Sequence, residues 1–199
     1  TGLPEFVGDV WLHGEQIVGV CPSQDAAEPA YFAQWRSENP VVVDCTGKVI
    51  APGFIDVHTH DDAAALNSPD MLPKLSQGVT TVIAGNCGIS LAPMVTDKPP
   101  APLSLLGDKQ FRFGDMKAYA EAVDRAKPAI NIAALLGHTS LRIKHMADLS
   151  RPANAAERAA MVDDMNAAMD AGALGLSSGI FYREAFAAGR RMPGIQRLR

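Results

Sequence analysis

The sequence predicts an α/β fold in which helices cover a parallel sheet. Apolar or β-branched runs alternate with helical patterns from residue 49 to residue 176, and this alternation is typical of strand–helix–strand units. Right-handed crossovers then leave either a doubly wound sheet or part of a (β/α)₈ barrel. The pattern contains four such strands, whereas a complete barrel has eight and typically about 250 residues. The 199 residues are therefore too few for a complete barrel.

A small β unit precedes this region. Residues 5–20 predict two short strands that meet at a turn at 13–15, because apolar residues alternate on both sides of a glycine. Residues 41–45 predict a further strand that ends in a turn at 46–48.

The α/β region follows with short elements in a regular order. A helix is expected to begin after Asp115, and another after Asn154, because both residues can cap a helix N-terminus. The second of these helices is expected to bury a stripe that contains Met161 and Val162. The predicted elements are a strand at 49–60, a helix at 69–77, a strand at 79–84, a Gly- and Pro-rich excursion at 93–114, a helix from 115 to Pro128, a strand at 130–136, the helix after Asn154 and a strand at 173–176.

The composition excludes several classes of protein. Hydrophobic residues make up 47% of the chain and charged residues 20%, which argues against intrinsic disorder. The net charge of −4 and the lack of a basic stripe argue against nucleic acid as a partner. No apolar run is long enough to cross a membrane. Three cysteines are too few for a disulfide framework, so we expect a cytoplasmic protein.

Charge is unevenly distributed along the chain. Residues 183–199 contain five Arg and one Glu, whereas the preceding 182 residues have a net charge of −8. We therefore expect residues 183–199 to form a divergent, Arg-rich tail.

Potential metal ligands follow two neighbouring predicted strands. Asp56, His58 and His60 alternate at one strand end, and this spacing places their side chains on one face. Cys87 follows the next strand, within Gly85–Gly88. Active sites of parallel α/β folds lie at the carboxyl ends of the strands, and imidazole and thiolate groups favour zinc. The sequence therefore predicts a zinc site with His58, His60 and Cys87.

Other reactive side chains have less specific surroundings. His138 ends a predicted strand and could equally line a substrate site or have a structural role. His145 and Arg142 are expected at the surface. Cys21 and Cys45 are expected to be inert.

Four segments resemble the D-aminoacylases, which are N-acyl-D-amino-acid deacylases of the metal-dependent amidohydrolase superfamily. The resemblance extends over roughly residues 5–182. The segments are APGFIDVHTHDD at 51–62, GNCGIS at 85–90, GH at 137–138 and GALGLSSG at 172–179.

The resemblance implies the front half of a (β/α)₈ TIM-type amidohydrolase barrel in residues 51–182, after part of a small β-sandwich domain in residues 1–50. It implies one or two Zn²⁺ ions on the residues already named, and substrate contacts by Tyr182, His138 and Ser178. The implied reaction is hydrolysis of the amide bond of an N-acyl-D-amino acid. The catalytic aspartate is expected beyond the chain end, so no catalytic residue is assigned here; Asp61 and Asp62 do not match its position.

Two alternatives remain open from the sequence. One is another amidohydrolase, a cyclic amidase that resembles hydantoinases or dihydroorotases. The other is a truncated or frame-shifted product that binds zinc at most. We expect the chain by itself to be inactive and to self-associate through an open barrel edge.

Overall fold

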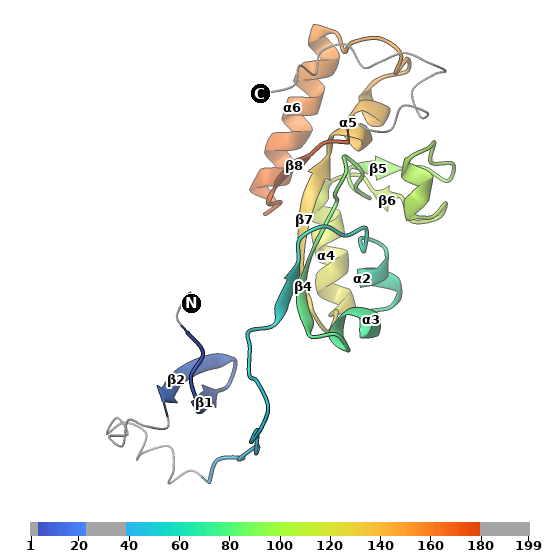
Figure 1. The fold of residues 1–199 in the computed structure, drawn as a ribbon. Coiled ribbons are helices and arrows are strands. Elements are labelled where there is room, and N and C mark those ends of the chain that lie inside the picture. Colours follow the sequence, from blue (N-terminus) through green and yellow to red (C-terminus); the bar gives the residue numbers. More distant parts are fainter. Residues whose placement is uncertain (1–3, 23–38, 180–199) are drawn as a thin grey trace. The chain divides into compact units, whose positions relative to one another are not determined.

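The computed structural model describes residues 4–22 and 39–179 (Figure 1), so the predicted tail at 183–199 lies outside the described residues. The chain divides into two units, Thr1–Ala51 and Pro52–Arg199. Within the described ranges, no helix is both long and apolar enough to cross a membrane.

The first unit contains a β-hairpin. Strands β1 (Gly8–His13) and β2 (Gln16–Pro22) pair antiparallel, as predicted, around a turn at Gly14. The turn at 46–48 also forms, and the Lys48 N–H donates to the Cys45 carbonyl (2.9 Å). The predicted strand at 41–45 is wrong: Val41 is 93% exposed, and no strand pairs with this segment in the described part of the unit.

The second unit contains a four-stranded parallel sheet. Its strands are β3 (Phe54–Asp56), β4 (Val79–Ala84), β7 (Asn131–Gly137) and β8 (Gly175–Ser177). They lie side by side in chain order, β3-β4-β7-β8. A doubly wound sheet must reverse its strand order at one point, whereas a (β/α)₈ barrel does not. The order therefore identifies the front half of a barrel.

The predicted strand at 49–60 is much shorter in the structure. Phe54 is paired with Val79, where β4 begins, and among the residues that the structure describes no strand pairs with 49–53. Beyond Asp56, the Thr59 N–H donates to the Ile83 carbonyl of β4 (3.2 Å).

Helices connect the parallel strands. Short helices α2 (Ala64–Asn67) and α3 (Leu72–Leu75) precede β4. Helix α3 lies within the helix predicted at 69–77 but is only about one turn long. Helix α4 (Met116–Ala126) precedes β7, and α5 (His138–His145) and α6 (Ala155–Asp170) precede β8. The predicted caps form: Asp115 accepts from the Ala118 N–H, and Asn154 accepts from the Glu157 N–H. Helix α5 was not predicted.

The excursion at 93–114 forms a small layer of its own. Strands β5 (Met94–Val95) and β6 (Arg112–Phe113) pair antiparallel on either side of a 3₁₀ helix, η1 (Leu103–Leu106). Leu103 and Phe111 are fully buried in the main apolar core.

Helices α4 and α6 contribute to the same core. Met161 and Ala168 of α6 are buried there, but Val162 is 47% exposed, so the predicted stripe is too wide. Val162 follows Met161 by one residue, about 100° around the helix, and therefore lies beside the stripe.

Candidate metal centre

Three potential metal ligands meet at the carboxyl ends of β3 and β4. His58 and His60 follow β3, and Cys87 follows β4. One ligand atom from each side chain lies within 4.8 Å of the others. The His58 Nε2 is 2.9 Å from the Cys87 Sγ, and the two imidazole centroids are 6.2 Å apart. In residues 4–22 and 39–179, this is the one such group of histidine, cysteine or carboxylate side chains.

Thr59 fixes the segment that carries both histidines. Its side chain is 5% exposed, and both its N–H and its hydroxyl donate to the Ile83 carbonyl of β4, each at 3.2 Å. Successive side chains of an extended segment point in opposite directions. Anchoring Thr59 against β4 therefore turns His58 and His60 away from that contact.

Asn86 connects the histidine segment to the cysteine loop. Its buried amide donates to the Ile83 carbonyl (2.7 Å) and makes longer contacts with the carbonyls of Val57 (3.4 Å) and Thr59 (3.5 Å). Sequence reasoning missed this role, since its only signal was the position of Asn86 beside Cys87.

The cysteine loop, residues 85–88, has an unusual backbone. Gly85, Cys87 and Gly88 all have positive φ, at 78°, 55° and 77°. A left-handed conformation is costly for a non-glycine residue, of the order of 1–3 kcal/mol, and persists only where its surroundings impose it. The conformation of Cys87 therefore depends on contacts around the loop.

Those contacts come from β8 and α5. The Ser177 hydroxyl accepts from the Gly88 N–H (3.0 Å) and donates to the Gly85 carbonyl. The Gly88 carbonyl accepts from the first N–H groups of α5, those of Thr139 (2.9 Å) and Ser140 (3.3 Å). The loop is thus held at both ends.

Asp62 holds the same loop from the β3 side. Its buried carboxylate accepts from the Gly85 N–H (3.2 Å), and burial raises the pKa of Asp62 to about 6. Its backbone carbonyl accepts from the Tyr119 hydroxyl of α4 (3.0 Å). These contacts account for Asp62 as a structural residue.

Asp56 does not join the two histidines as the spacing predicted. Its carboxylate binds the Lys74 ammonium of α3 at 2.7 Å, and Lys74 also pairs with Asp61 at 3.1 Å. The hydrogen bond from Lys74 lowers the pKa of Asp56, with a smaller contribution from the His58 N–H. Asp56 therefore contacts α3, whereas His58 and His60 lie beside Cys87.

The electrostatics of the centre favour a neutral imidazole at His60. Burial, and secondarily the His58 charge, lower the pKa of His60 below its ordinary value. Neutral imidazole is the form that binds metal ions.

Two of the three predicted substrate contacts are among the residues that the structure describes, and both lie at the carboxyl-terminal edge of the sheet. His138 is the half-buried first residue of α5, directly after β7, and burial followed by the Arg142 charge lowers its pKa. Ser178 directly follows β8 and is exposed. Tyr182 lies outside the described residues.

Arg142 and His145 are not the surface residues that the sequence predicted. Arg142 is 8% exposed and donates to the carbonyls of Leu149 and Arg151, both at 3.1 Å. His145 is half-buried, with its Nε2 2.6 Å from an Asp164 carboxylate oxygen of α6. Arg142 thus holds the segment between α5 and α6, and His145 joins α5 to α6. Neither role has a local sequence signal.

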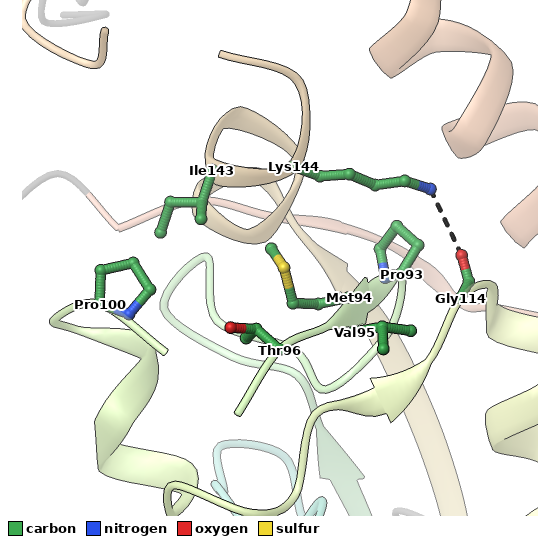
Figure 2. A pocket seen from close by; sticks show the side chains of 8 residues that line it. All are labelled: Pro93, Met94, Val95, Thr96, Pro100, Gly114, Ile143 and Lys144. Carbon is green, nitrogen blue, oxygen red and sulfur yellow. Dashed lines mark hydrogen bonds between the residues drawn. The ribbon is translucent and has the colours of Figure 1, made fainter. Parts of the chain in front are cut away.

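A separate hollow of about 460 Å³ lies beside β5. Figure 2 shows the side chains that line it. Lys144 extends along its rim and donates to the Gly114 carbonyl (3.3 Å). None of the three potential metal ligands contributes to it. Its lining residues are Pro93, Met94, Val95, Thr96, Pro100, Gly114, Ile143 and Lys144.

Known proteins share both the sequence and the fold. The sequence model of the amidohydrolase family matches residues 41–190. The N-acyl-D-aspartate deacylase of Alcaligenes xylosoxydans xylosoxydans is 51% identical over 188 residues, which are 94% of this chain and 36% of that protein. The crystal structure of a D-aminoacylase matches with a TM-score of 0.81 at 44% identity, over 92% of this chain and 36% of the other.

A third similar protein is the N-acyl-D-glutamate deacylase from Bordetella bronchiseptica, whose structure was solved with zinc and a phosphonate inhibitor. It matches with a TM-score of 0.66 at 48% identity, over 71% of this chain and 30% of that one. This chain thus spans about a third of the length of these relatives. The resemblance to the deacylases is confirmed, and, since the family match covers most of its residues, the chain belongs to the amidohydrolase family.

Proposed function

We propose that the protein is a zinc-dependent deacylase that hydrolyses an N-acyl-D-amino acid to a D-amino acid and a carboxylate. The observation that carries this proposal is the cluster of His58, His60 and Cys87 at the carboxyl ends of the first two barrel strands. Active sites of barrel enzymes lie at this end of the sheet.

The donor set fits zinc. Two imidazoles and one thiolate favour a borderline ion such as Zn²⁺ over Mg²⁺ or Ca²⁺, which prefer oxygen ligands. The N-acyl-D-glutamate deacylase that resembles this chain was solved with zinc. We infer that His58, His60 and Cys87 hold one or two such ions. When bound, zinc supplies Lewis acidity for amide hydrolysis.

The surrounding residues have supporting roles. Thr59 and Asn86 orient the histidine segment through the Ile83 carbonyl. His138 and Ser178 follow the next two strands, so we assign them, with Tyr182, to the substrate pocket. Because its pKa is lowered, His138 is mainly neutral near neutral pH. A neutral imidazole can donate one hydrogen bond to a substrate and accept another.

A deacylase is a better account than a ring-opening amidase. The relatives named above are a deacylase of N-acyl-D-aspartate, a D-aminoacylase and a deacylase of N-acyl-D-glutamate. Because they are about three times as long, the proposed activity belongs to a protein with a complete barrel.

The proposed reaction also carries expectations about partners, location and self-association. We expect a small-molecule substrate, a cytoplasmic protein and no nucleic-acid partner. Ile55 of β3 and Leu176 of β8 leave apolar surface exposed on the two outer strands of the described sheet. We therefore expect the 199-residue chain to self-associate, which sedimentation velocity measures; a monomer at all concentrations contradicts this.

Activity on matched enantiomers tests the proposed function. The full-length protein should hydrolyse N-acetyl-D-aspartate, N-acetyl-D-glutamate or N-acetyl-D-methionine but not the L-enantiomers. Chelation should abolish the activity, and added zinc should restore it. Equal rates on both enantiomers, or full activity after verified removal of metal, would contradict the proposal.

A further inference from the structure

Ser177 and Ser178 are neighbours with different environments. Ser178 is exposed, whereas Ser177 is 8% exposed and comes from the fourth strand of the sheet, 89 residues after the Gly88 amide that it binds. Its hydroxyl accepts from that N–H and donates to the Gly85 carbonyl. One small side chain therefore bridges the first and last residues of the cysteine loop.

The bridged groups are directly connected to Cys87. The Gly88 N–H belongs to the peptide bond that joins Cys87 to Gly88, so its hydrogen bond fixes the orientation of that peptide plane. Cys87 itself has a positive φ of 55°, a conformation that its surroundings must impose. Closing the loop between Gly85 and Gly88 imposes it.

The site requires a hydroxyl because one atom both accepts and donates there. An alanine at this position leaves a buried N–H and a buried carbonyl without this partner. Relaxation of the loop toward new partners for these groups would move Cys87, which lies between them.

We propose that Ser177 is a positioning residue that holds Cys87 in its metal-binding conformation. Packing of β8 against the loop that follows β4 would then be required for Cys87 to bind zinc tightly. The inference rests on the proposed function, in which Cys87 binds zinc. Groups that orient metal ligands typically contribute about 10- to 100-fold to metal affinity.

Ser140 offers a matched control. It is fully buried, and its hydroxyl accepts from the Ser90 N–H (3.0 Å) and donates to the Ser90 carbonyl (2.9 Å). Ser140→Ala therefore removes the same two kinds of hydrogen bond from Ser90, beyond the cysteine loop, and keeps the Ser140 N–H that donates to the Gly88 carbonyl. Both variants should lose comparable stability, but only Ser177→Ala should affect Cys87.

The experiment measures zinc affinity of the full-length protein by competition with a chromophoric chelator. Ser177→Ala should weaken zinc binding about 10- to 100-fold, while Ser140→Ala stays near the wild type. In the metal-free protein, Cys87 should also react faster with iodoacetamide in Ser177→Ala. Equal zinc affinities and unchanged thiol reactivity in the two serine variants would overturn the inference.

Two further variants separate the possible failures. Cys87→Ala must itself weaken zinc binding; if it does not, the proposed function fails, whereas a weakened Cys87→Ala beside an unaffected Ser177→Ala rejects only the role of Ser177. If Ser177→Ala does not fold, the isosteric pair Ser177→Thr and Ser177→Val replaces it. The Ser177→Thr variant should bind zinc at least about tenfold more tightly than the Ser177→Val variant. Equal zinc affinities of these two variants would reject the positioning role of Ser177.

Discussion

At the scale of single residues, the candidate centre depends on backbone groups as much as on its ligands. Gly85 has a φ of 78°, and a side chain there would collide with the Leu135 carbonyl of β7. Both constraints exclude a Cβ atom. The glycine before Asn86 and Cys87 therefore allows the cysteine loop to pack against β7.

Replacement of Gly85 tests this close approach. Gly85→Ala should lower the free energy of unfolding by more than about 2 kcal/mol, because positive φ and the collision with Leu135 add. Gly172→Ala is the control, since Gly172 also has positive φ (92°) but has open space around it. Urea denaturation measures both, and equal losses would contradict a steric role at Gly85.

The three potential ligands could be predicted from the sequence because strand periodicity and strand ends have local signals. His58 and His60 alternate, and Cys87 follows a β-branched run. The supporting residues could not be predicted. Ser177 and Asp62 reach the cysteine loop only through tertiary packing, and Lys74 draws Asp56 toward α3 through a contact 18 residues away.

At the scale of elements, α6 is the clearest case in which local sequence determines structure. Asn154 and Glu157 form a capping box: each side chain accepts a hydrogen bond from the backbone N–H of the other. Glu157 also binds Arg151 through both carboxylate oxygens, at 2.5 and 2.7 Å. The start of α6 is thereby tied to the segment that precedes it.

This arrangement predicts a dependence of stability on pH. The hydrogen bond from Arg151, and then that from the Asn154 N–H, lower the pKa of Glu157 from 4.5 to about 2. A lowered pKa in the folded state means that the stabilisation is complete above pH 4.5 and is lost as the pH falls toward 2. Wild type should exceed Glu157→Gln in stability near neutral pH, and the difference should shrink through this range. A difference in urea denaturation midpoint between wild type and Glu157→Gln that stays constant with pH would contradict the stabilising role of the Glu157 carboxylate.

Elements without a neighbour were predicted less well. The run of three valines at 41–43 and the apolar residues at 49–53 indicated strands, but a strand forms only where another strand accepts its hydrogen bonds. Helix α5 was missed because its first turn is capped by the Gly88 carbonyl of a distant loop rather than by a nearby side chain.

At the scale of the whole molecule, the order of the strands shows which of two parallel α/β folds the chain adopts. The sequence allowed a doubly wound sheet or a barrel, and the order β3-β4-β7-β8 without reversal distinguishes them. Because the four strands are parallel, their carboxyl ends lie at one edge, together with the histidines, Cys87, His138 and Ser178.

The proposed function requires this edge to bind zinc through the Cys87 thiolate and the two histidines. X-ray absorption at the zinc edge of the zinc-loaded full-length protein tests it most directly. The wild type should show a sulfur neighbour at about 2.3 Å from zinc and nitrogen neighbours at about 2.0 Å, and Cys87→Ala should lose the sulfur signal. A wild-type spectrum with no sulfur neighbour, or a sulfur signal that persists in Cys87→Ala, would contradict it.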